Sequence, residues 1–149
     1  MNTFRRSLAW LTIALTALFI GTAQAENSKD IGDYVVHYNA LTTDFLQPDI
    51  AKAHGITRSG SRAMVNVTVM KKVMGLTAQP SRASVTGHAV NLSQQIKGLN
   101  FRETSDGGAI YYIADLPVSH EEVLDFQLEV TPEGGRPVNV SFRQQFFTR

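Results

Sequence analysis

Three methionines and one histidine in the middle of the chain are the residues best suited to metal chemistry. Met64, Met70, Met74 and His88 lie within 25 residues of one another, and thioether sulfur is a ligand that selects cuprous copper. Met64 and Met70 are an even number of residues apart in an alternating segment, so they share one strand face. Methionine also commonly fills hydrophobic cores, and no His-x-Met or Met-x-Met pair occurs. A copper carrier using Met64, Met70 and His88 is therefore the alternative hypothesis, and the main interpretation expects no cofactor.

The motifs that could support catalysis are incomplete. Residues 55–62 have the glycine spacing of a phosphate-binding loop, but Ser61 stands where lysine is required. His120 begins a sequence like that of a zinc-protease helix, but Leu124 occupies the position of the second histidine. The chain contains no cysteine, which excludes thiol catalysis and disulfides. We therefore predict a non-catalytic protein and keep a small hydrolase as a further alternative.

Aromatic and basic side chains suggest a surface that binds a partner. Tyrosine and arginine are enriched among the residues that dominate the energy of protein interfaces. Tyr111 and Tyr112 should point to opposite faces of one strand, so only one of them can be at the surface. A tyrosine with a buried ring and an exposed hydroxyl is the competing interpretation. The residues assigned to this predicted binding surface are Tyr38, Asn39, His54, Arg58 and Tyr112.

The N-terminal segment has the three parts of a secretory signal peptide. Arg5 and Arg6 are positively charged, residues 8–20 form an uncharged apolar run, and residues 23–25 (Ala-Gln-Ala) match the cleavage pattern. An apolar run of 13 residues is shorter than the roughly 20 that a membrane-spanning helix needs. We therefore predict a signal peptide at 1–25, cleavage between Ala25 and Glu26, and a periplasmic product without a transmembrane segment.

The remaining residues, 26–149, have the size and charge of one soluble domain. Removal of 25 from 149 residues leaves 124, enough for a hydrophobic core. The chain has 14 basic and 13 acidic side chains, so loss of Arg5 and Arg6 leaves 12 against 13. A nearly neutral surface does not attract nucleic acid over long range. The partner that we expect is an envelope protein, and no nucleic acid.

Alternating hydrophobicity predicts that the domain is built from short strands. In residues 34–41 the odd and even positions form two separate faces, and Ala63, Val65, Val67 and Val69 share one face of residues 61–72. Pro48 and Gly55 bound a short helix over residues 48–54. Residues 26–32 are polar and are predicted to be a loose lead-in. The seven predicted strands are 34–41, 61–72, 82–92, 99–104, 109–114, 123–131 and 138–147.

This series of strands predicts an all-β fold. Strands separated by turn signals every 8–12 residues are typical of antiparallel sandwiches. We therefore expect an antiparallel immunoglobulin-like β-sandwich of about seven strands, with one short helix after the first strand.

Several stretches of the chain resemble a known family. They are residues 32–41, 56–59, 62–71, 109–115, Phe126 and 142–146. They are similar to the exported Gram-negative proteins grouped as domain-of-unknown-function family 4426, and the resemblance extends over the whole of residues 26–149. The positions that match its pattern are Tyr38, Asn39, Ala51, Arg58, Ser59, Asn66, Tyr111 and Tyr112. The resemblance implies a periplasmic β-sandwich and brings no activity, cofactor or catalytic residue with it.

Overall fold

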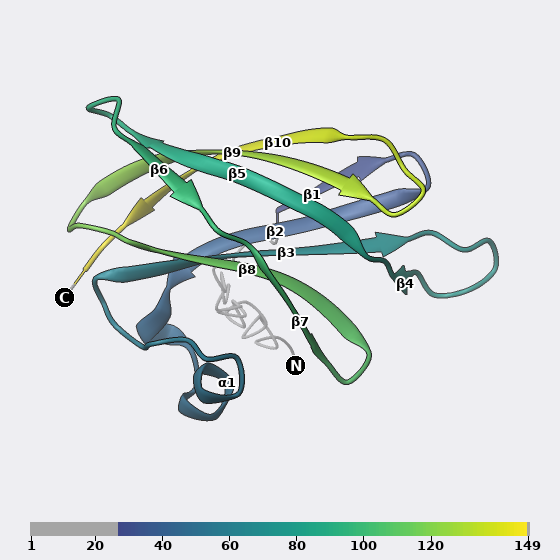
Figure 1. Cartoon of the computed structure of the whole chain (residues 1–149), viewed down its shortest axis with the longest axis horizontal. Helices are drawn as coiled ribbons and strands as arrows, with labels where there is room; N and C mark the ends of the chain where they lie inside the picture. The colour runs from purple at the N-terminus through teal and green to yellow at the C-terminus, as the bar shows by residue number, and fades with distance from the viewer. Residues whose placement is uncertain (1–26, 149) are drawn as a thin grey trace, which may run out of the picture.

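The computed structural model describes residues 27–148, which form ten strands in two antiparallel sheets packed face to face (Figure 1). The predicted β-sandwich is confirmed, with ten strands in the described part of the chain instead of about seven. The predicted cleavage residues Ala25 and Glu26 lie outside the described residues. Within residues 27–148, no helix is both long enough and apolar enough to cross a membrane.

The larger sheet, which we call sheet A, has the strand order β1-β2-β3-β8-β7, and β4 pairs with β3. The other sheet, sheet B, has the order β10-β9-β5-β6. The strands of sheet A are β1 (Asn27–Ile31), β2 (Tyr34–Thr42), β3 (Arg62–Lys71), β4 (Gln79–Pro80), β7 (Arg102–Asp106) and β8 (Ala109–Pro117). Those of sheet B are β5 (Ala83–Asn91), β6 (Ile96–Leu99), β9 (Glu122–Pro132) and β10 (Val138–Phe146).

The core lies between the two sheets and consists of the side chains that alternate inward. On sheet A, Val65 and Val67 are fully buried and belong to the same core cluster as Phe126 of sheet B. The Phe126 ring stacks on that of Phe142, with centroids 4.7 Å apart. The two separate faces predicted for β2 and for β3 are present, and on each strand every second residue belongs to this cluster. Burial of this apolar surface is the main term that stabilises the domain.

Two predicted boundaries are wrong, and each has a physical reason. The predicted strand 99–104 spans a crossover, because the chain leaves sheet B at Leu99 and enters sheet A at Arg102. Leu99 and Phe101 both contact the core and are two residues apart, so their spacing resembles that of one continuous strand. The predicted lead-in forms β1, which pairs with β2 through a turn at Gly32 (φ 71°). β1 is an edge strand that is exposed over most of its length, so its sequence carries no hydrophobic alternation.

A short segment covers part of the outer face of sheet A, which is the face turned away from sheet B. It contains η1 (Thr43–Phe45), the predicted helix α1 (Pro48–Ala53) and a loop that follows it. Figure 1 shows α1 below the sheets. Ala51 and Ile56 of this segment are buried against Met64 of β3 and Ile113 of β8. The helix thus covers one part of the outer face, and no described element covers the part beside it.

Candidate binding site

Strand register places polar side chains from β2 and β3 side by side on the outer face of sheet A. Asn39 lies directly opposite Asn66, and His37 lies opposite Thr68. All four alternate with core residues and therefore point outward. Asn66 in turn lies opposite Ile113 of β8, where the side chains of α1 begin to cover the sheet. This register brings two carboxamides together next to a hydrophobic corner.

These side chains line a groove made of two adjoining hollows. The first, of about 330 Å³, lies over β2, β3 and β8. The second, of about 200 Å³, lies between α1 and the sheet, and the two share Asn66 and Tyr111. We call the combined feature the outer groove. Its main lining residues are His37, Asn39, Leu46, Ile50, His54, Ile56, Met64, Asn66, Thr68, Met70, Asp106, Tyr111 and Ile113.

Both carboxamides of the outer groove have an unsatisfied oxygen. Asn39 Oδ1 and Asn66 Oδ1 are buried and accept no hydrogen bond from any described residue. Buried polar atoms are nearly always hydrogen-bonded, and an unsatisfied one costs about 1–3 kcal/mol. Directly opposite residues have Cβ atoms roughly 5 Å apart, so one bound molecule can reach both amides. The arrangement lowers the stability of the domain unless something donates hydrogen bonds in the groove.

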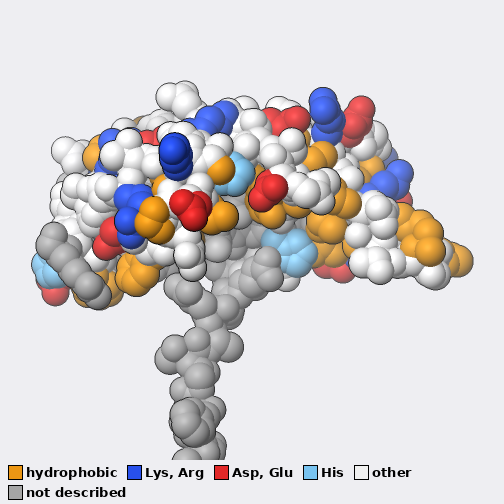
Figure 2. Space-filling view, turned by 90° about the horizontal axis from the view of Figure 1, so that it is seen from below, with side chains coloured by type: hydrophobic (Ala, Val, Ile, Leu, Met, Phe, Trp, Pro, Cys, Tyr) orange, Lys and Arg blue, Asp and Glu red, His pale blue; other side chains and the backbone are white. Residues whose placement is uncertain are grey.

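The outer groove is poor in charge compared with the other side of the sandwich. Asp106 is the one Lys, Arg, Asp or Glu among the described residues that line the two hollows. Sheet B, by contrast, carries the ion pairs Lys97–Glu122 and Arg143–Asp125. Figure 2 views the molecule from the side on which α1 lies, where hydrophobic and histidine side chains are interspersed with charged ones. Loss of charged residues at the centre of a surface patch is typical of protein interfaces.

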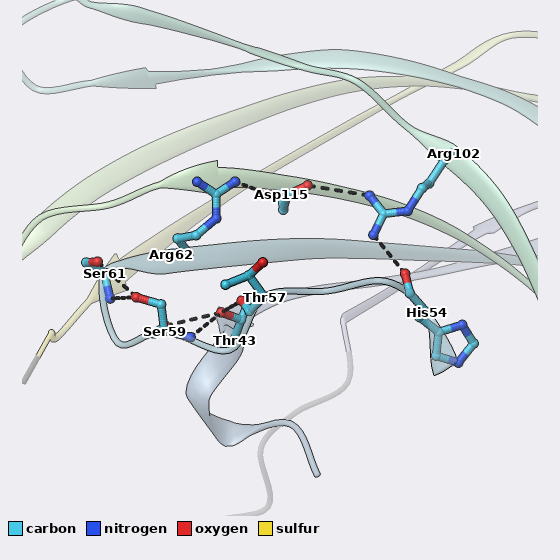
Figure 3. A network of polar contacts seen from close by, with 8 residues as sticks. All are labelled: Thr43, His54, Thr57, Ser59, Ser61, Arg62, Arg102 and Asp115. Atoms are coloured by element: carbon cyan, nitrogen blue, oxygen red, sulfur yellow. Dashed lines mark hydrogen bonds and ion pairs between the residues drawn. The ribbon is translucent and has the colours of Figure 1, made fainter. Parts of the chain in front are cut away.

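An ion-pair network holds the covering segment beside the groove. Asp115 of β8 binds both Arg62 and Arg102, and Arg102 also donates a hydrogen bond to the His54 carbonyl at 3.1 Å (Figure 3). The hydrogen bond from Arg62 holds the pKa of Asp115 below its usual value. Because His54 caps the end of α1, this network fixes the helix over the sheet.

Thr43 fixes the loop that follows α1. Its side chain is fully buried, and its Oγ1 donates to the Thr57 carbonyl at 2.8 Å and accepts the Ser59 N–H at 2.9 Å (Figure 3). The segment with the spacing of a phosphate-binding loop is therefore a packed surface loop that leads into β3. This agrees with the absence of the required lysine.

Comparison with known proteins places the whole described domain in one family. The model of the family "Domain of unknown function (DUF4426)" matches residues 28–149. The chain belongs to the DUF4426 family. A crystal structure of a DUF4426 family protein from Pseudomonas aeruginosa PAO1 has a TM-score of 0.73 and 37% sequence identity to this chain. The match covers 85% of this chain and 98% of the other. No curated protein matches the chain.

Two tyrosines of the predicted binding surface lie on the inner face of sheet A in this DUF4426 domain. Tyr112 is only 5% exposed. Its hydroxyl accepts a hydrogen bond from the Ala83 N–H at 2.8 Å and donates one to Glu103 at 3.0 Å, and burial raises its pKa. Tyr38 is partly buried against Phe142, with ring centroids 4.9 Å apart. Tyr112 therefore links the sheets from inside. Tyr111 lines both hollows of the outer groove, and Tyr38 also contributes to the lining of the first hollow.

The other three residues of the predicted surface lie on the outer side of sheet A. Asn39 is in the outer groove, and so is His54, whose Nδ1 lies 3.0 Å from Thr104 Oγ1. Arg58 is exposed and donates to the Asp44 carbonyl at 2.9 Å. The structure thus does not bring the five residues together at one exposed site. Sequence analysis named Asn66 only as a position that matches the family pattern and did not assign it to the binding surface, although its place among alternating valines marks it as outward.

The residues of the copper alternative are too far apart to hold one ion. Met64 and Met70 share the outer face of sheet A but are six residues apart along β3, which corresponds to roughly 20 Å. His88 lies on β5 next to the buried Ala89 and so points to the outer face of sheet B. In the described part of the chain, no group of three or more His, Asp or Glu side chains is arranged to hold a metal ion. That ligand set is therefore wrong.

Proposed function

We propose that the protein is an exported, non-catalytic interaction module of the periplasm that binds an envelope protein through the outer groove. The observation that carries this proposal is the pair of buried carboxamide oxygens without a partner among the described residues, Asn39 Oδ1 and Asn66 Oδ1. An unsatisfied buried polar group calls for an explanation, and a bound molecule that donates hydrogen bonds to both oxygens would supply one.

Several side chains of the groove suit recognition of a partner. Much of its lining consists of the carboxamides of Asn39 and Asn66, the hydroxyl of Thr68 and the thioether of Met70. None of these groups takes up or releases protons near neutral pH, so they suit recognition by hydrogen bonding and contact. The low charge of the groove favours a protein partner with an uncharged contact surface.

The N-terminal sequence supports export. The charged, apolar and small-residue parts of residues 5–25 have the order of a signal peptide. N-terminal sequencing of the protein from a periplasmic fraction should give Glu26 as the first residue. Recovery of only the intact 149-residue chain from the cytosol would refute this part of the proposal.

Chemical crosslinking in living cells tests the partner surface with matched variants. Thr68 lies in the outer groove, whereas Thr86 is exposed on the outer face of sheet B. Thr68→Arg should place a bulky charge in the groove and abolish a partner adduct that mass spectrometry detects with the wild type. Thr86→Arg adds the same charge elsewhere and should leave the adduct unchanged. Equal adduct yields from the two variants, with both folded by circular dichroism, would refute the groove as the binding surface.

A further inference from the structure

We infer that the outer groove binds an extended, uncharged segment of its partner's polypeptide, with Asn39 and Asn66 hydrogen-bonded to the segment's backbone and one aliphatic side chain seated beside α1. This inference rests on the proposed function and specifies the kind of partner that the groove accepts.

The two carboxamides match the hydrogen-bonding groups of a peptide backbone. A carboxamide carries an acceptor oxygen and a donor NH₂ group, and each peptide unit offers one N–H and one C=O. Asn39 and Asn66 lie directly opposite each other, at a Cβ spacing of roughly 5 Å. An extended chain rises about 3.3 Å per residue and its N–H groups alternate between the two edges, so those on one edge are roughly 6.6 Å apart. Two such N–H groups can therefore meet both amides. The unsatisfied oxygens would then accept backbone N–H groups.

The second hollow supplies a hydrophobic site at the end of this polar row. Ile50, Ile56, Met64 and Ile113 contribute apolar surface to it, and Asn66 is part of its lining. Ile50 is 44% exposed, although it lies on the helix that covers the sheet. A volume of about 200 Å³ is several times the roughly 30 Å³ that one water occupies. A side chain such as leucine that enters here would cover Ile50 while its own backbone lies near Asn66.

Charge in the groove disfavours acidic segments. Asp106 is the one carboxylate among the described residues that line the groove, and it belongs to the same hollow as the aliphatic side chains. An aspartate or glutamate of the partner would meet this like charge and two acceptor oxygens. The groove therefore favours neutral, aliphatic sequences over acidic ones.

An array of random octapeptides, acetylated at the N-terminus and amidated at the C-terminus, tests this inference with the processed protein from the periplasm. Bound peptides should share an aliphatic residue at one position and contain few Asp or Glu residues. Asn39→Ala and Asn66→Ala should each weaken binding about tenfold, the effect of one or two lost hydrogen bonds. Asn139→Ala, an exposed position on β10 of sheet B, is the matched control and should bind like the wild type.

Backbone recognition has a specific signature in ester analogues of a bound peptide. Replacing one amide of the peptide by an ester removes a single N–H. At one position this replacement should weaken binding to the wild type but not to the variant, Asn66→Ala or Asn39→Ala, that lacks the asparagine facing that N–H. Equal loss in the wild type and both variants would overturn backbone recognition by the asparagines. If no peptide binds although Thr68→Arg abolishes the crosslink in cells, the inference fails and the proposed function stands. If Thr68→Arg also keeps the crosslink, both fail.

Discussion

Replacing Asn66 by valine should make the free domain more stable while it removes binding. The substitution deletes a buried Oδ1 that has no partner among the described residues, in a strand whose buried neighbours are already valines. An unsatisfied buried oxygen costs about 1–3 kcal/mol, and valine suits a strand better than asparagine. We take the lower end of this range because the substitution also removes the polar NH₂ group of Asn66. The expected net gain in the free energy of unfolding is about 1 kcal/mol.

Thermal unfolding followed by circular dichroism measures this gain. For a domain of this size, about 1 kcal/mol corresponds to a rise in Tm of roughly 3–5 °C. Thr86→Val makes a similar change on the exposed outer face of sheet B and should alter the stability by no more than about 0.5 kcal/mol. A decrease in Tm for Asn66→Val, with Thr86→Val unchanged, would show that Asn66 stabilises the fold. The reasoning that assigns it to binding would then be refuted.

Three further substitutions test the contacts that position the groove. Tyr112→Phe should lower the free energy of unfolding in urea by about 2 kcal/mol, whereas Tyr111→Phe should leave it almost unchanged, and equal losses from the two variants would contradict the role of Tyr112. Because the folded-state pKa of Tyr112 is raised, its contribution should be present below about pH 10 and fade above it. Asp115→Asn should lower the free energy of unfolding by about 1 kcal/mol near neutral pH. Because the Arg62 contact lowers the folded-state pKa of Asp115, the difference in stability between the wild type and this variant should shrink as the pH falls below about 4. A difference that stays constant down to pH 2 would refute the stabilising role of the Asp115 carboxylate. Thr43→Val should cost about 1–3 kcal/mol and speed amide exchange in residues 57–59, and unchanged exchange there would refute its role in the loop.

The sequence predicted the elements with strong alternation and missed those without it. β3 alternates buried valines with outward residues along most of its length, so its existence and its two faces could be predicted. β1 is an exposed edge strand and β4 has only two residues, and neither has a hydrophobic pattern to detect. The crossover was not predicted because Leu99 and Phe101 are two residues apart and both contact the core, as in one continuous alternating strand.

The candidate site was harder to predict because it depends on strand register. Choosing residues by type selected Tyr38 and Tyr112, although Tyr38 falls on the same face of β2 as the buried Val36. The pairing of Asn39 with Asn66 joins two strands that are far apart in sequence. Register is set by which faces the whole sheet buries, so no local pattern in either strand indicates the pair.

Photo-crosslinking from single positions in cells tests the central claim most directly. A photoreactive residue introduced at position 68 should trap a protein of the envelope, whereas the same residue at position 86 should trap none above background. Replacing Asn39 by alanine in the position-68 protein should reduce the adduct. A position-86 adduct as strong as that from position 68, or a position-68 adduct that does not depend on Asn39, would contradict binding through the outer groove.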